Sequence, residues 1–336
     1  MTKVFYTILL LCTVAILAIG CQDSNYWEKT QRSRGNLTEV KKNVKLLEPD
    51  SVLLSDFSYI KVLGNYLAIP DLKSSGKLVH LFDKETLSYI ASAGNLGQGP
   101  REISSIAAVA YDEKDDCLQV VDYGSKNVYS FNMDDVRKNP DYLPSVKLEL
   151  RNDVVPYEYH FLSDTLSYGS FIIPDGQSSS MRIGRWNMHT GEVQVHNSEH
   201  PATKGNVVVY DYSNKHDLIV ECSNKYDLIN IFDGQLNLKT RVYGPEWEEN
   251  GDNKQHFLSV VIYKDWIIAA YDGKDRQTDS MPTICHVFDL DGNYIKTLDI
   301  GYKIWRMSVD EDNDRLYLSF QDEIQFGYLD LKGILD

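Results

Sequence analysis

Apolar and polar residues alternate in short runs along most of the chain, and one pattern returns at intervals of 41 to 56 residues. Six times an apolar run ends in a bulky residue followed by Asp or Asn: Phe82-Asp83, Phe131-Asn132, Trp186-Asn187, Phe232-Asp233, Phe288-Asp289 and Leu329-Asp330. A period of two is typical of β-strands, and no convincing helical period follows the N-terminal region. The sequence therefore predicts an all-β chain built from a repeated unit.

Superposing the repeats gives four strands per unit. Residues 108–111, an acidic turn and residues 118–122 correspond to residues 307–309, an acidic turn and residues 316–320. A third strand then reaches the aromatic-Asp pair, and a short turn opens a fourth. Because the repeat length fits a four-stranded propeller blade, we predict six blades. They lie near residues 53–94, 103–150, 154–199, 206–244, 255–300 and 302–334.

The last predicted blade has no fourth strand of its own, since only six residues follow Asp330. Residues 44–48, with the sequence VKLLE, resemble residues 146–150, VKLEL, the fourth strand of the second blade. We expect residues 44–48 to complete blade six, which removes an open edge from the ring. The predicted fold is an all-β, six-bladed β-propeller of four-stranded antiparallel blades, closed by an N-terminal strand.

The N-terminus has the pattern of a secretion signal. Lys3 precedes an apolar run at residues 4–19, and small residues then lead to Cys21. The run is short for a membrane-spanning helix, and a polar stretch follows it directly. This resembles the signal of bacterial lipoproteins, with an ordinary signal peptide or an uncleaved anchor helix as alternatives. We assign residues 1–20 to a lipoprotein signal peptide, 21–37 to a polar tether after lipidated Cys21, and 38–336 to the propeller.

The formal charge of the chain is −15, and removal of residues 1–20 takes away one lysine. An acidic surface repels phosphate backbones, which argues against nucleic acid as a partner. The predicted partners are a lipid bilayer, through acylated Cys21, and a glycan, peptide or protein ligand. Cys117, Cys222 and Cys285 have no disulfide-framework spacing, so we interpret them as small buried residues.

A glycine-rich segment at residues 94–103 carries Gly97, Gly99, Pro100 and Glu102 at the spacing G-x-G-P-x-E. On these residues the chain resembles the six-bladed, TolB-like β-propeller lipoproteins of Bacteroidetes. The resemblance implies export, a lipid anchor in the cell envelope, and a binding function. A phosphate-binding loop is disfavoured, because no Lys-Ser or Lys-Thr follows and Pro100 lacks a donor. We expect a crossover between blades, with positive φ at the glycines.

Two functions of different class remain open. The first is a non-catalytic binding or scaffold protein, and its candidate residues are Arg101 and Glu102 in the crossover and Glu158, His160 and His256 at the channel mouth. The second is a hydrolase or lyase with one divalent cation in the channel, held by carboxylates from several innermost strands, and its channel-side candidates are Glu102, Glu158, His160 and His256. The first needs no cofactor. The expected location is the outer membrane, on its periplasmic or its surface side.

Two further patterns resemble metal sites. Residues 196–200 fit the H-x-x-E-H pattern of zinc peptidases, but that chemistry needs a helix and this segment follows a strand. Asp310, Asp312 and Asp314 resemble a calcium loop, but Arg315 stands where the loop requires glycine. We interpret the acidic segment as a solvated hairpin turn.

Overall fold

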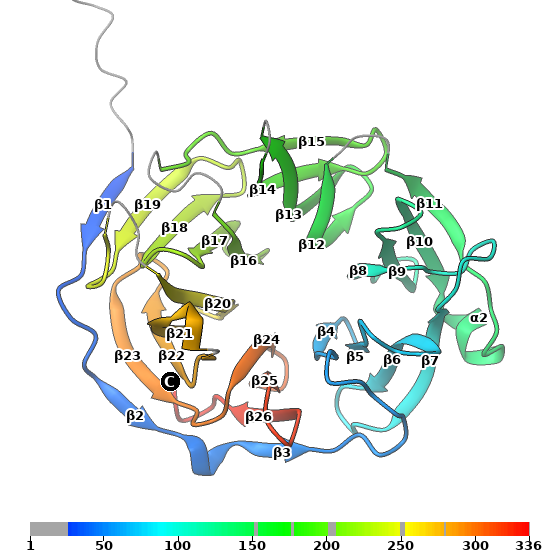
Figure 1. Cartoon of the computed structure of the whole chain (residues 1–336), viewed down its shortest axis with the longest axis horizontal. Helices are drawn as coiled ribbons and strands as arrows, with labels where there is room; N and C mark the ends of the chain where they lie inside the picture. The colour runs from blue at the N-terminus through cyan, green and yellow to red at the C-terminus, as the bar shows by residue number, and fades with distance from the viewer. Residues whose placement is uncertain are drawn as a thin grey trace, which may run out of the picture.

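The described residues form a ring of six antiparallel sheets around a central channel (Figure 1). The structure, a computed structural model, describes residues 26–150, 154–175, 178–200, 206–248, 253–278 and 280–335. The signal peptide and Cys21 lie outside these residues, so their assignments stay predictions. No helix within the described part of the chain is long and apolar enough to cross a membrane.

In blades one to three, the four strands follow one another from the channel to the rim. Blade one consists of β4 (Lys61–Leu63), β5 (Tyr66–Pro70), β6 (Lys77–Asp83) and β7 (Tyr89–Asn95). Blade two consists of β8 (Ile106–Asp112), β9 (Cys117–Asp122), β10 (Asn127–Asn132) and β11 (Ser145–Glu149). Blade three consists of β12 (Val155–Ser163), β13 (Leu166–Asp175), β14 (Ser178–Asn187) and β15 (Glu192–Val195).

Blades four to six continue the same order, except that the last strand of blade six comes from the N-terminus. Blade four consists of β16 (Val208–Ser213), β17 (Leu218–Ser223), β18 (Leu228–Asp233) and β19 (Leu238–Tyr243). Blade five consists of β20 (Lys254–Tyr263), β21 (Trp266–Asp275), β22 (Ile284–Asp289) and β23 (Tyr294–Asp299). Blade six consists of β24 (Ile304–Asp310), β25 (Arg315–Phe320), β26 (Phe326–Asp330) and β3 (Lys45–Leu47).

The predicted closure is confirmed, because β3 pairs antiparallel with β26 in a register that places Lys45 opposite Tyr328. A backbone hydrogen-bond ladder thus joins the start of the propeller to its last blade. Such a junction removes the open edge that an incomplete blade would present.

The segment predicted to be a tether is part of the propeller from Trp27 onward, so that prediction is wrong for these residues. β1 (Trp27–Thr30) adds in parallel to β19, and β2 (Leu37–Glu39) adds in parallel to β23, each as a fifth strand. A short 3₁₀ turn, η1 (Lys41–Asn43), then leads to β3. We call residues 26–48 the N-terminal strap, and Figure 1 shows it along the outside of blades four, five and six.

Each of the six repeated pairs ends the third strand of a blade. In five of them the Asp or Asn oxygen accepts backbone N–H groups of the following turn, as Asp83 does from Thr86 at 2.7 Å. The bulky residue before it is buried, and each packs in a different interface between neighbouring blades: Phe82, Phe131, Trp186, Phe232, Phe288 and Leu329. The repeat therefore encodes both the turn and the core of every interface.

Two further features differ in detail from expectation. The acidic turn at residues 310–314 is not fully solvated, because Asp310 is 2% exposed. Lys84 of blade one contacts Asp310 at 3.2 Å and Asp312 at 2.7 Å, which links blade one to blade six. The three cysteines are free, and Cys222 and Cys285 are buried as predicted.

Candidate functional site

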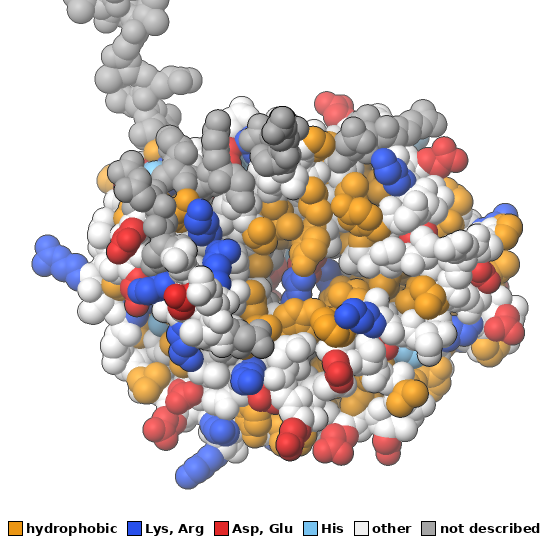
Figure 2. Space-filling view, viewed as in Figure 1, with side chains coloured by type: hydrophobic (Ala, Val, Ile, Leu, Met, Phe, Trp, Pro, Cys, Tyr) orange, Lys and Arg blue, Asp and Glu red, His pale blue; other side chains and the backbone are white. Residues whose placement is uncertain are grey.

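The channel holds a pocket of about 410 Å³, lined by residues of all six innermost strands. Many lining residues belong to the ends of these strands and to the hairpins that follow them. Figure 2 shows a hollow at the centre of the molecule, with hydrophobic side chains around it and basic side chains deeper inside. Such a concave site with a few convergent polar groups is typical of a ligand-binding pocket.

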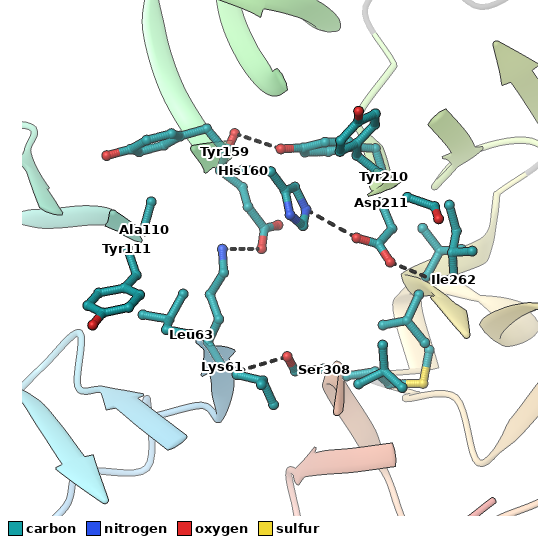
Figure 3. Close-up of a pocket in the computed structure, with 18 of the residues that line it drawn as sticks. Lys61, Leu63, Ala110, Tyr111, Tyr159, His160, Tyr210, Asp211, Ile262 and Ser308 are labelled. Atoms are coloured by element: carbon teal, nitrogen blue, oxygen red, sulfur yellow. Dashed lines mark hydrogen bonds and ion pairs between the residues drawn. The ribbon is translucent and has the colours of Figure 1, made fainter. Parts of the chain in front are cut away.

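Strand β12 places two of the predicted residues in this pocket. Side chains alternate along a strand, so Glu158 and His160 share one face. Both line the pocket, whereas Tyr159 between them points into the core and donates to Gln119 Oε1 at 2.9 Å. Glu158 and His160 thus line the channel pocket, and their role in binding stays a prediction; Figure 3 shows His160 facing the channel.

Glu158 is the centre of a charged cluster across the channel. Its carboxylate lies 3.1 Å from Lys61 Nζ on β4 and 3.6 Å from Arg306 Nη1 on β24. Burial alone would raise the pKa of Glu158, but Lys61, Arg306 and His160 together lower it to about 2. Glu158 is therefore an anion at physiological pH, and it links blades one, three and six.

His160 and Asp211 form the second polar pair of the channel. His160 Nε2 lies 3.1 Å from Asp211 Oδ1, and the other carboxylate oxygen accepts the backbone N–H of Ile262 at 2.6 Å. The His160 ring also packs edge-on against Tyr210, with 5.5 Å between ring centroids. Asp211 on β16 thereby connects blade three with blade five (Figure 3).

Aromatic rings surround Arg306 next to the pocket. Its guanidinium lies 5.7 Å from the centroid of Tyr59 and 5.5 Å from that of Tyr157, and it donates to Tyr157 Oη at 2.8 Å. Trp305 packs edge-on against Tyr59 at 5.9 Å and against Phe57 at 6.4 Å. Tyr157 is 40% and Phe57 41% exposed, so rings of this cluster are open to a ligand.

Glu102 does not line the channel pocket, contrary to its predicted place there. Its carboxylate folds back in the crossover and accepts the N–H of Gly99 at 2.8 Å. A Cβ atom at Gly97 would stand 1.9 Å from the Glu102 Oε2 atom. A side chain at Gly97 or Gly99 would displace the Glu102 carboxylate from this turn, and the positive φ values fall on Gly94 and Arg101. The G-x-G-P-x-E motif closes a crossover, and exposed Arg101 lies in the same turn.

His256 does not line the channel pocket either. It is 1% exposed, and its Nδ1 atom lies 3.2 Å from the hydroxyl of Tyr271 on the neighbouring strand. Its backbone N–H donates to the carbonyl of Asn224 in blade four. Register shifts near the start of β20 accompany this inward position. The structure thus brings together Glu158 and His160 and leaves Arg101, Glu102 and His256 elsewhere.

Three charged channel residues were missed by sequence reasoning: Lys61, Asp211 and Arg306. Each interrupts an apolar or aromatic run within an innermost strand, as Arg306 does between Trp305 and Met307. Superposing the first strands of the blades would have found this signal. Single charged positions in otherwise buried strands carry functional information when they recur at one place in a repeat.

From the sequence we predict that residues 196–200 do not bind zinc and that residues 310–314 do not bind calcium. Side chains of these segments have other partners. His196 Nε2 lies 3.1 Å from Glu221, and His200 packs against Trp247 with 5.1 Å between centroids. Within the described ranges, no group of three or more His, Cys, Asp or Glu side chains has a geometry that could hold a metal ion. Of the carboxylates that line the pocket, Glu158 and Asp211 are each paired with a basic or imidazole side chain.

A ring of six blades around a channel with paired charges defines a six-bladed β-propeller as the class of this protein. Residues 31–217 match the family model DUF5128, which is described as a 6-bladed beta-propeller. The match covers more than half of the chain, and the protein belongs to this family. No curated protein matches the sequence significantly.

Two solved structures from Bacteroides resemble the fold. One is a member of the DUF4221 family from Bacteroides vulgatus, with 14% identity, a TM-score of 0.56, and coverage of 85% of this chain and 94% of that chain. The other is a protein from Bacteroides fragilis named as exported, with 12% identity, a TM-score of 0.54, and coverage of 87% and 88%. At such identities the similarity supports the fold alone.

Proposed function

We propose that this protein is a non-catalytic binding propeller that holds its ligand in the central channel. The observation that carries the proposal is the pocket of about 410 Å³, in which Lys61, Glu158, Arg306, His160 and Asp211 converge from four blades. A carboxylate paired with two basic groups is a poor metal ligand, because the metal would have to displace both. This pairing favours binding over metal-dependent hydrolysis.

Among glycan, peptide and protein ligands, the pocket best fits a carbohydrate. Three basic side chains (Lys61, Lys215 and Arg306) and four acidic ones (Glu113, Glu158, Asp211 and Glu311) line the pocket with His160, so it offers donors and acceptors without a large net field. Sugar hydroxyls bond to such groups, and sugar faces stack on aromatic rings. The ring of Tyr59, which lines the pocket beside Arg306, supplies that stacking surface, and the exposed rings of Tyr157 and Phe57 belong to the same aromatic cluster.

Binding is expected on a glycan array probed with the soluble chain from Gln22 onward, which keeps the strap. We expect Tyr59→Ala to weaken the affinity for a selected glycan about tenfold or more, since stacking is lost. Tyr89→Ala, at a ring 42% exposed on the outer strand β7, is the matched control and should bind like wild type.

Glycan binding that survives Tyr59→Ala would place the ligand outside the channel and contradict the proposal. Calorimetry with calcium and with zinc tests the enzyme alternative in the same preparation. Heat of binding that Glu158→Gln abolishes would support a channel metal instead of a sugar.

We further propose that the protein is a lipoprotein of the outer membrane, anchored through Cys21. The proposal rests on the apolar run at residues 4–19 and the small residues that lead to Cys21. The strap begins at Tyr26 beside blade four, where Arg241 lies over its ring at 5.3 Å. Five residues span at most about 18 Å, so an acylated Cys21 would hold blade four close to the bilayer.

Substituting the anchor residue tests this location. In Cys21→Ser, we expect the protein to move from the membrane fraction to the soluble fraction of lysed cells, because the acyl chains are lost. Cys117→Ser is the matched control and should stay in the membrane fraction. An unmodified Cys21 thiol in the mass spectrum of the processed protein would contradict the proposal, and protease treatment of intact cells would distinguish the two sides of the membrane.

A further inference from the structure

Neighbouring blades diverge toward the rim and leave six clefts, of which described residues fill five. Between blades one and two lies α2 (Met133–Lys138), whose Met133 and Val136 are buried in that interface. Between blades three and four, residues 196–199 join Phe232, Arg182 and Arg241.

The strap and the segment after it fill three more clefts. Arg34 lies between blades four and five, and Val40 and Val44 are buried between blades five and six. Between blades six and one, Val52 and Leu54 pack against the interface cluster, and Ser55 bonds to Asp71 and Gln325. Filling of the clefts is thus a general property of this propeller.

The cleft between blades two and three is different. It holds a pocket of about 430 Å³, and no described residue occupies it. Phe171 and Trp186 lie at its base but are only 0% and 2% exposed, and the partly exposed side chains of Leu148 and Val193 form its apolar walls. Both walls belong to outermost strands, β11 and β15, so the cleft is accessible from the rim.

Strand β11 also presents a free edge beside this cleft. In the described part of the sheet, β10 is its one strand partner. Val146 on this strand is 46% exposed. An exposed edge with apolar side chains is a template for a further strand, and proteins normally protect such edges.

The chain itself shows how the rim of this propeller accepts a strand. β1 adds to β19 and β2 adds to β23, both as fifth strands. Between them Arg34 inserts its side chain into the cleft between blades four and five, where its Nη1 atom reaches Asp227 at 2.8 Å. The strap therefore packs on blades four and five in a defined way. An extended backbone pairs with the outer strand, and one side chain enters the adjoining cleft.

We propose that β11 and the open cleft bind an extended peptide segment of a partner protein, which adds as a fifth strand to blade two. An apolar side chain of the peptide inserts between Leu148 and Val193, because this cleft, unlike that reached by Arg34, offers no buried carboxylate. Backbone pairing gives affinity and the cleft gives specificity, as in other cases of strand addition. This site is separate from the channel and does not depend on the proposed carbohydrate binding.

A displayed library of random peptides, selected on the wild-type chain alone, tests the proposal. We expect selected peptides to carry apolar residues at alternate positions, and to bind Val146→Lys roughly tenfold or more weakly. Leu46→Lys, at a residue 40% exposed on the outer strand β3, is the matched control and should bind as wild type does. Hydrogen exchange should show protection of residues 145–149 on binding.

A second variant covers the case in which Val146→Lys does not fold. His189→Trp changes an exposed residue at the rim of the cleft and should block insertion of the peptide side chain. Selected peptides that bind both variants as tightly as wild type, or that protect another strand, would overturn the proposal. Self-association that Val146→Lys abolishes and selected peptides do not inhibit would also overturn it, because the occupant would then be a second copy of the chain.

Discussion

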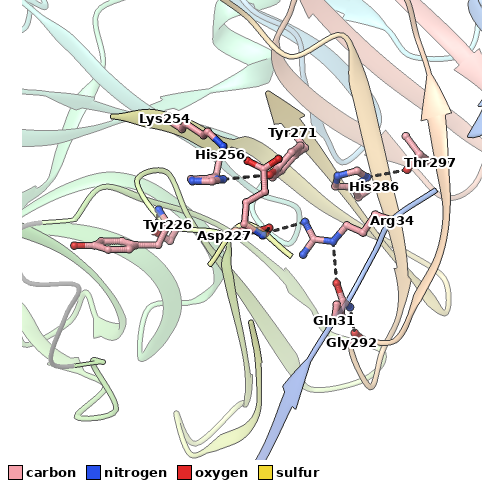
Figure 4. Close-up of polar contacts among 12 residues, drawn as sticks. Gln31, Arg34, Tyr226, Asp227, Lys254, His256, Tyr271, His286, Gly292 and Thr297 are labelled. Atoms are coloured by element: carbon pink, nitrogen blue, oxygen red, sulfur yellow. Dashed lines mark hydrogen bonds and ion pairs between the residues drawn. The ribbon is translucent and has the colours of Figure 1, made fainter. Parts of the chain in front are cut away.

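Replacing Arg34 by methionine is expected to lower the free energy of unfolding by about 3 kcal/mol or more. The guanidinium of Arg34 lies 2.8 Å from Asp227, and the side chains of the pair are 4% and 0% exposed (Figure 4). Methionine fills a similar volume but leaves the carboxylate of Asp227 buried without its cation. Removing one partner of a buried ion pair is costly, because the remaining charge has lost both water and its counter-ion.

The surroundings of Arg34 increase the expected effect. The guanidinium lies within 5.8 Å of the ring centroids of Phe257, Tyr271 and Phe288, so its loss also removes cation–π contacts. Burial, together with the charge of Arg34, lowers the pKa of His286 to about 3. His286 is therefore neutral at physiological pH and cannot replace the lost positive charge.

Urea unfolding of three variants checks this prediction. Arg32→Met changes an exposed arginine of the same strap and should unfold within about 0.5 kcal/mol of wild type. Adding Asp227→Asn to Arg34→Met should restore part of the stability, because the uncompensated charge is then gone. If Arg34→Met were as stable as Arg32→Met, the strap would not be fastened by this ion pair.

The blades and their closure could be predicted from the sequence, because both depend on strongly periodic, local patterns. In each pair the bulky residue fills an interface between blades, and the Asp or Asn after it ends the strand. Phe131 and Asn132 show both effects. The strap could not be predicted in the same way. β1 and β2 are held by backbone pairing on a rim exposed to water, and such pairing needs no apolar period.

The buried position of Arg34 could not be predicted from the composition of its segment. A single arginine in a polar stretch is usually solvated, and only the fold brings it to Asp227, 193 positions away in the sequence. The same limit applies to the channel. Glu158 and His160 lie two residues apart on one strand and share a face, whereas the crossover turn at Glu102 and the register shifts near His256 decide where those side chains lie.

Acid is expected to remove the stability that Glu158 contributes. The pKa of this carboxyl is about 2 in the folded chain, below its ordinary value of 4.5, so its contribution is fully present above about pH 5. It is lost as the pH falls from there toward 2. The side chain is 30% exposed, so water weakens the attraction to Lys61 and Arg306. We therefore expect a contribution of about 1–2 kcal/mol and not the full value of the shift.

Comparing wild type with Glu158→Gln at several pH values measures this contribution. Gln is never ionised, so wild type should be more stable by about 1–2 kcal/mol near pH 6, and the difference should decrease between pH 5 and pH 2. Glu113→Gln, at an exposed residue of the β8–β9 hairpin, is the matched control. A difference between wild type and Glu158→Gln that stayed constant down to pH 2 would show that Lys61 and Arg306 do not lower the pKa of Glu158. Glu158 would then titrate as an ordinary glutamate, and its attraction to these two side chains would contribute nothing to stability.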